Sequence, residues 1–143
     1  MNEYADHDSA TVDWYIIARG NYSEGKKEGR WIYYSDEIIT IGEYQNGKEE
    51  GEWRMYFFEA GKDTSHMQIS FMGNYLGGFE DGVHYYYFSN GKPREERRFH
   101  AGVRDGIWKR WDQDGSLVIS VTYADGMEQK VDGKKFELEA LKE

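Results

Sequence analysis

The side chains of this chain that could do chemistry are histidines, paired carboxylates and one acidic turn. The histidines are His7, His66, His84 and His100. They include no His-Glu-x-x-His pair and no two at ligand spacing along one strand, so they do not indicate a metal site. His84 stands where similar segments of the chain hold Trp, which favours a packed ring over a metal ligand.

The acidic turn is the stretch Asp-Gln-Asp-Gly at residues 112–115, which is similar to the end of a calcium loop. A calcium loop would need an acidic residue where Arg110 stands and a Glu further along, and both are missing. A hairpin turn is therefore favoured. The sequence predicts no metal and no cofactor.

Carboxylates and hydroxyls also form no catalytic pattern. The acidic clusters at residues 36–37 and 49–52 fall in turns or glycine loops, where solvated charge is expected. Each glycine loop leads into a strand, whereas a phosphate-binding loop needs a helix start after it. Ser116 follows a turn glycine and stands in no nucleophile motif. We therefore expect a protein that is not an enzyme.

The elements that carry these residues come from a repeated phrase: an aromatic, two residues, Gly, three residues, Gly, one residue, usually Trp, two residues and a second aromatic. Four copies are present: Tyr22, Gly25, Gly29, Trp31, Tyr34; Tyr44, Gly47, Gly51, Trp53, Tyr56; Tyr75, Gly78, Gly82, His84, Tyr87; and Phe99, Gly102, Gly106, Trp108, Trp111. A fifth, incomplete copy opens at Tyr123 and Gly126. Such periodicity indicates a repeat architecture. The longer spacing from Tyr56 to Tyr75 predicts an extended connection there.

Segments between the glycines alternate in polarity and are rich in aromatic and β-branched residues, which predicts strands. They are residues 12–18, 30–34, 38–44, 52–58, 67–71, 83–88, 95–99, 107–111 and 117–123. We predict one all-β domain over residues 1–143, an elongated antiparallel meander of tandem β-hairpins. It has an N-terminal capping strand at 11–19, hairpin repeats at about 20–126, and a C-terminal cap and tail at 127–143 with a short helix over 136–143.

Because strand side chains alternate between faces, the Trp of each copy and the aromatic three residues later should point to opposite faces unless a bulge intervenes. One predicted ladder is Trp31, Trp53, His84 and Trp108; the other is Tyr34, Tyr56, Tyr87 and Trp111. The first Gly of each copy should close the loop with a positive φ, and the second should leave bare backbone against which a ring lies flat. If neither the strand near Trp14 nor the tail covers it, the second ladder is a platform for a partner; otherwise both ladders are core.

The composition of the chain limits the classes of partner that it is expected to bind. The chain has no Cys, which excludes thiol catalysis and disulfides, and a net charge of −9. This charge disfavours nucleic acid and anionic membrane lipid and favours a basic protein partner.

The basic run at residues 92–98 is interpreted as charge that protects an edge strand, with an anionic contact patch as the alternative. No apolar run of membrane-spanning length or signal peptide is present, which predicts a cytoplasmic protein, or an exported one if a leader preceded Met1.

The Tyr-x-x-Gly-x-x-x-Gly-x-Trp-x-x-Tyr phrase resembles MORN repeats, specifically the bacterial variant with the longer glycine spacing. The resemblance spans residues 22–126, with His84 in place of Trp and a fifth copy that lacks its second Gly and Trp. It implies a non-catalytic binding or scaffold module, and the bacterial arrays imply an antitoxin-like neutraliser of a protein. The alternative is a module that binds carbohydrate or another polar ligand through an exposed aromatic ladder in the cell envelope. Self-association is left open.

Overall fold

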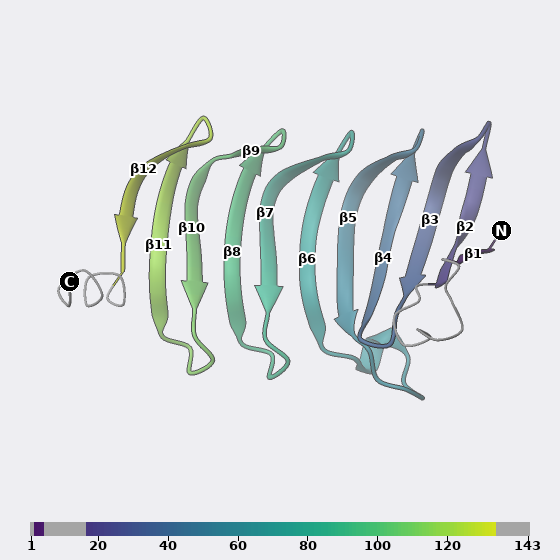
Figure 1. The fold of residues 1–143 in the computed structure, drawn as a ribbon, viewed down its shortest axis with the longest axis horizontal. Helices are drawn as coiled ribbons and strands as arrows, with labels where there is room; N and C mark the ends of the chain where they lie inside the picture. Colours follow the sequence, from purple (N-terminus) through teal and green to yellow (C-terminus); the bar gives the residue numbers. More distant parts are fainter. Residues whose placement is uncertain (1, 5–16, 134–143) are drawn as a thin grey trace, which may run out of the picture.

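The computed structural model describes residues 2–4 and 17–133, and its strands form one 12-stranded antiparallel sheet (Figure 1). Neighbours in the sheet follow the order of the chain, except that β9 pairs with β8 alone. The strands are β1 (Asn2–Tyr4), β2 (Ile17–Ser23), β3 (Lys26–Tyr34), β4 (Ile38–Gln45), β5 (Lys48–Phe57), β6 (Ile69–Leu76), β7 (Phe79–Tyr87), β8 (Pro93–His100), β9 (Val103–Arg104), β10 (Gly106–Trp111), β11 (Leu117–Ala124) and β12 (Met127–Asp132). The predicted all-β meander of hairpins is confirmed.

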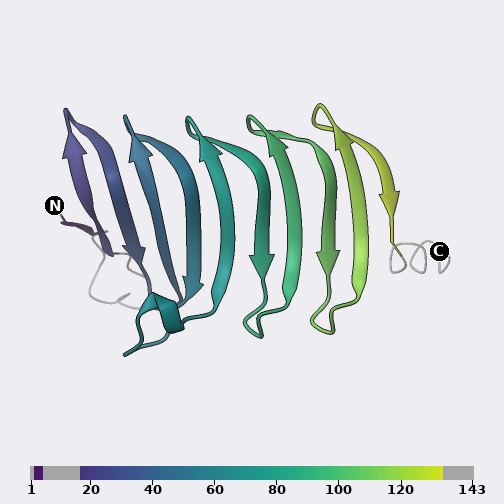
Figure 2. The ribbon, with the colours of Figure 1, turned by 180° about the vertical axis from the view of Figure 1, so that it is seen from behind.

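The sheet is a single layer. Substantial contacts between elements are those between neighbouring strands, and the two opposite views show no second sheet or helix layer of described residues over either face (Figures 1 and 2). The glycine loops lie together at one end of the strands, which we call the glycine-loop edge, and the turns between copies lie at the other end (Figure 1). No helix of the described residues is long and apolar enough to cross a membrane.

Each glycine loop is a two-residue turn with positive φ at both central residues. In the second copy these are Asn46 (φ 52°) and Gly47 (φ 80°), a pattern typical of the type I′ turns that match strand twist. The turn glycine also donates its N–H to a carbonyl of the preceding hairpin, as from Gly47 to Lys27 at 2.9 Å. Successive loops are therefore linked along this edge, and the predicted role of the first glycine is confirmed.

The second glycine of each copy has a different role from the predicted one. Gly51 has φ of 73°, and no atom lies within 4 Å of the position that a Cβ would take. It starts a bulge in β5. Ile41 pairs with Arg54 and Glu43 pairs with Glu50, so β5 has two more residues than β4 between these pairs. The second glycine therefore bends the strand and is not the backbone on which a ring lies; that expectation was wrong.

The bare backbone on which each buried ring lies is supplied instead by a third glycine, which stands two residues before the first aromatic of a copy. A Cβ at Gly20 or Gly42 would overlap the indole of Trp31 or Trp53, and one at Gly73 would lie 2.6 Å from Cγ of His84. The bulge turns each ring back onto the preceding strand. These contacts bury Trp31, Trp53 and His84 to 0%, 6% and 1% exposure.

The buried rings form one continuous ring ladder with the first aromatics of the copies. Its members are Tyr22, Trp31, Tyr44, Trp53, Tyr75, His84, Phe99, Trp108 and Tyr123, with successive centroids 5.1 to 6.1 Å apart, mostly edge to face. Each such pair contributes about 0.5–1.5 kcal/mol beyond burial. The predicted Trp ladder thus supplies four of the nine rings of a longer ladder. The ring ladder is the core of this single-layer protein.

The fourth copy lacks the third glycine, and Arg97 stands in its place. The Trp108 ring is only half-buried, although its Nε1 donates to the Arg98 carbonyl at 2.8 Å as Trp31 Nε1 does to Asn21 at 3.1 Å. The ring ladder is therefore packed less tightly toward the C-terminal end.

The extended connection predicted between Tyr56 and Tyr75 is residues 58–68, which include the 3-10 turn η2 (Thr64–His66). It returns toward the preceding copy, since Phe58 N–H donates to the Glu37 carbonyl in the β3–β4 turn at 2.9 Å. Figure 2 shows the segment at the sheet edge opposite the glycine loops. Met67 is buried at its end.

The predicted caps are only partly within the described residues. Residues 17–19 of the N-terminal capping strand belong to β2, and residues 11–16 with Trp14 lie outside the described part. β1 pairs with β2, a strand that the sequence did not predict. The C-terminal cap is β12, which pairs with β11 over Met127–Asp132, whereas the predicted helix over 136–143 lies outside the described residues.

Candidate functional site

The predicted platform residues lie on the face opposite the ring ladder, near the edge away from the glycine loops. Tyr34, Tyr56, Tyr87 and Trp111 each stand three residues after the buried ring of their copy, at or near the end of a strand, and all are half-buried. In the register Tyr34 is opposite Ile39, which is opposite Tyr56. Among the described residues no ring contact joins the four to one another. They form a spaced row in which Ile39 separates Tyr34 from Tyr56, and their binding role stays a prediction.

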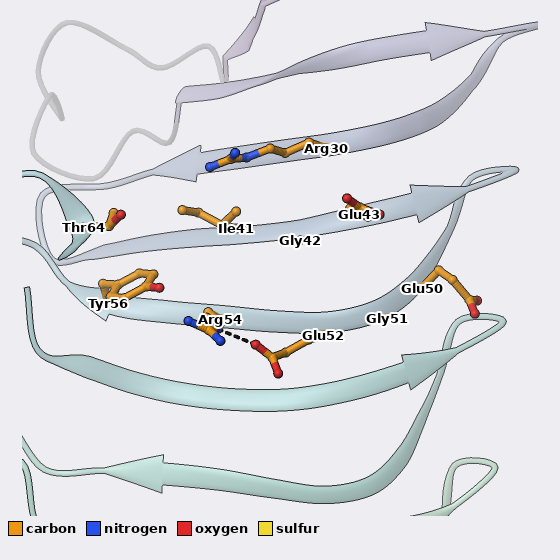
Figure 3. A pocket seen from close by; sticks show the side chains of 10 residues that line it. All are labelled: Arg30, Ile41, Gly42, Glu43, Glu50, Gly51, Glu52, Arg54, Tyr56 and Thr64. Carbon is orange, nitrogen blue, oxygen red and sulfur yellow. Dashed lines mark hydrogen bonds and ion pairs between the residues drawn. The ribbon is translucent and has the colours of Figure 1, made fainter.

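A hollow of about 450 Å³ adjoins Tyr56 on this face (Figure 3). Three neighbouring strands and the extended connection build it: β3 supplies Arg30, β4 supplies Ile41 and Glu43, β5 supplies Arg54 and Tyr56, and Thr64 comes from η2. Figure 3 shows Thr64, Ile41 and Tyr56 gathered at one end and the acidic side chains toward the glycine-loop edge. The longer connection in the middle of the chain thus closes one end of the hollow.

The hollow carries charges of both signs. Arg30 is opposite Glu43 in the register, and Arg54 forms an ion pair with Glu52 on the same strand. A hydrogen bond with Tyr56, followed by the one with Glu52, raises the pKa of Arg54 above its usual value. The Arg54 and Glu52 side chains remain 48% and 49% exposed. Such groups can bind polar or charged parts of a partner.

The lining of the hollow is mainly charged and polar. The residues that line it include no His, Cys or Ser, and Arg54 and Glu52 are held together as an ion pair. Within residues 17–133, no three His, Cys, Asp or Glu side chains are placed to hold a metal ion.

The basic run was misinterpreted as edge protection, because β8 lies inside the sheet between β7 and β10. One arginine of the run, Arg97, pairs instead with a largely buried carboxylate. Glu95, whose side chain is 12% exposed, accepts from Arg97 Nη2 at 2.6 Å and from Arg110 Nε at 3.1 Å. The Arg97 guanidinium also lies 4.5 Å from the Tyr86 ring centroid. Sequence analysis missed Glu95 because the three side chains meet across two strands.

Among the three histidines of the described residues, only His84 is buried. Burial lowers its pKa below the usual 6.5, and this outweighs the hydrogen bond from Nε2 to the Asn74 carbonyl at 2.8 Å, which raises it. The ring is therefore neutral in the folded protein near neutral pH. The interpretation of His84 as a Trp substitute in a packed ladder is confirmed by its ring contacts with Tyr75 and Phe99.

We expect His84→Trp to reduce the acid sensitivity of folding. Since the folded pKa is below 6.5, the contribution of neutral His84 is complete above pH 6.5 and is lost as pH falls through the folded value. The measurement is the urea unfolding free energy at about pH 7.5 and about pH 5.5, where carboxylates titrate little. The wild type should lose stability over this interval and His84→Trp should lose less. His100→Gln, at an exposed side chain, is the matched control, and an equal loss in His84→Trp would contradict the expectation.

Comparison with known proteins bears on the third and fourth copies. No curated protein matches the chain. In the structure the two matching segments are consecutive strand pairs, β7 with β8 and β10 with β11. Residues 80–101 and 104–125 each match the family model described as MORN repeat variant, which places these two copies among sequences similar to that repeat.

Proposed function

We propose that this chain is a non-enzymatic binding or scaffold module that engages a basic protein through the face bearing Tyr34, Tyr56, Tyr87 and Trp111. The observation that carries the proposal is a row of half-buried aromatic side chains on a single-layer sheet, next to a hollow of about 450 Å³. Rigid aromatic side chains with a polar end are the groups that most often supply binding energy in protein interfaces. The match to MORN repeat variants favours a binding or scaffold role.

The basic charge of the partner is argued from the excess of acidic residues, which gives a net charge of −9. Opposite net charges speed association and disfavour acidic competitors. The more specific form of the proposal is an antitoxin-like role, in which the sheet neutralises a basic toxin by covering its functional surface. This form rests on the resemblance to bacterial repeat arrays.

The test is co-purification followed by titration of the purified partner. We expect a stoichiometric basic protein whose affinity falls at least tenfold in Tyr56→Ala and Trp111→Ala, since truncating an interface anchor typically costs about 2 kcal/mol or more. Phe79→Ala is the matched control, because Phe79 is 58% exposed at the glycine-loop edge. Circular dichroism checks that each variant is folded.

Unchanged affinity in folded Tyr56→Ala and Trp111→Ala variants would overturn the proposal. Binding of an oligosaccharide, detected as a change in tryptophan fluorescence that Tyr56→Ala removes, would instead favour the carbohydrate alternative.

A further inference from the structure

The face that carries the ring ladder holds a second kind of position, which repeats with the hairpins. The residue two places after the first glycine of each copy is Lys27, Glu49, Glu80 or Arg104. Each is opposite the first aromatic of its copy in the register, as Lys27 is opposite Tyr22 and Glu49 is opposite Tyr44. Directly opposite residues project from the same face, so these charged side chains lie beside the ring ladder.

In the first copy this position places an ammonium group among three rings. Lys27 Nζ lies 4.7, 5.2 and 5.3 Å from the ring centroids of Trp31, Tyr33 and Tyr44. It donates to the Tyr33 hydroxyl at 2.8 Å, and that hydroxyl lies 2.7 Å from the hydroxyl of Tyr44. Cation–π attraction and hydrogen bonding hold the ammonium there.

The fourth copy repeats the arrangement with a guanidinium. Arg104 lies 5.1 Å from the Trp108 ring centroid and 5.4 Å from that of Tyr123. In the third copy, Arg97 lies over Tyr86, which is the equivalent of Tyr33. We call the rings around this position in each copy its ring set. Three of the four ring sets therefore hold a cation from this chain.

The second copy has the rings but a carboxylate in place of the cation. Trp53 and Tyr75 lie 6.1 Å apart at 68°, Met55 takes the place of Tyr33, and Glu49 takes the place of Lys27. Glu80 is opposite Tyr75 on the same face. Burial, then the negative charge of Glu80, followed by Tyr86 and Glu49, raises the pKa of Tyr75 to about 12. Among the described residues neither side chain has an ion pair.

We propose that the second copy binds a lysine side chain of a basic protein over the Trp53 and Tyr75 ring pair and against the carboxylates of Glu49 and Glu80. We call these four residues the lysine slot. The occupant follows from Lys27, an ammonium group already seated in the equivalent ring set of the first copy. The inference goes beyond the proposed function, because it adds a second recognition surface for basic protein segments. It lies on the face opposite Tyr56 and Trp111, so the two can fail separately.

The experiment titrates the whole chain with an acetylated and amidated tetralysine peptide, by calorimetry and by the NMR signal of the Trp53 indole N–H. The wild type should bind and shift this signal, and the same peptide with acetylated side chains should not, because acetylation removes the charge. Glu49→Lys should fill the slot from within the chain and weaken binding at least tenfold. Lys27 shows that the fold accepts lysine at this position.

Two further variants separate the slot from general charge attraction. Glu37→Lys makes the same charge change at an exposed turn residue, and should retain most of the binding. Lys27→Ala empties the first ring set and should increase the number of peptides bound. Tyr56→Ala and Trp111→Ala should leave peptide binding unchanged even where they abolish binding of the protein partner.

Equal loss in Glu49→Lys and Glu37→Lys would overturn the lysine slot and indicate attraction by net charge alone. Binding that persists in Glu49→Lys, or a Trp53 signal that does not move in the wild type, would overturn it as well.

Discussion

Gly42→Ala is expected to destabilise the protein far more than Gly51→Ala, although Gly51 belongs to the repeated phrase and Gly42 does not. A Cβ at Gly42 would overlap the Trp53 indole, so the ring must leave its place in the ring ladder. Displacing a buried aromatic side chain costs about 3 kcal/mol or more. Gly51→Ala meets no atom within 4 Å and pays only for a φ of 73°, about 1–2 kcal/mol. Urea unfolding of the two variants measures the difference.

The control for this comparison is Gly25→Ala, which has positive φ and open space like Gly51 but lies at a loop tip. It should resemble Gly51→Ala. If Gly42→Ala were as mild as these two, the indole would be free to move aside, and close packing of rings on glycine would not be what stabilises the sheet.

The hairpin architecture was predictable because its signals are local. A type I′ turn needs residues that tolerate positive φ, and alternating strands follow each one, so the phrase beginning at Tyr44 is sufficient to predict a hairpin. The position of the extended connection followed from one unequal spacing. Both depend on neighbours in sequence and need no knowledge of the third dimension.

The third glycine was not predictable by the same reasoning. Gly42 precedes its copy and supports a ring from the next strand, so its function appears only when the bulge at Gly51 has turned Trp53 backward. A signal was nevertheless present, because Gly20, Gly42 and Gly73 each stand two residues before the first aromatic. This recurring spacing is the feature of the sequence that marks the third glycine.

The candidate site divides in the same way. That Trp31 and Tyr34 lie on opposite faces followed from strand alternation. The hollow at Tyr56 could not be predicted in this way, because it forms only where Thr64 of the extended connection lies beside residues of three strands. The pairing of Glu95 with Arg97 and Arg110 could not be predicted either, since a run of basic residues gives no indication of which carboxylate lies among them.

Trp31→Ala is expected to destabilise the protein by about 3–5 kcal/mol, the usual cost of removing a buried Trp. The ring is 0% exposed, lies on Gly20 and contacts Tyr22 and Tyr44 edge to face, and its loss also leaves the Asn21 carbonyl without the indole donor. Trp108→Ala should cost clearly less, because that ring is half-buried and no glycine lies beneath it.

The same two variants test how far the damage spreads. In a single-layer array each hairpin contacts only its neighbours, so Trp31→Ala should remove hydrogen-exchange protection from β2, β3 and β4 and leave β8 to β12 protected. Trp108→Ala should show the reverse pattern. Uniform loss of protection in either variant would mean that the ring ladder couples all hairpins into one cooperative unit, because each ring packs against rings of both neighbouring copies. The partner-binding face would then lose its shape wherever the ladder was broken.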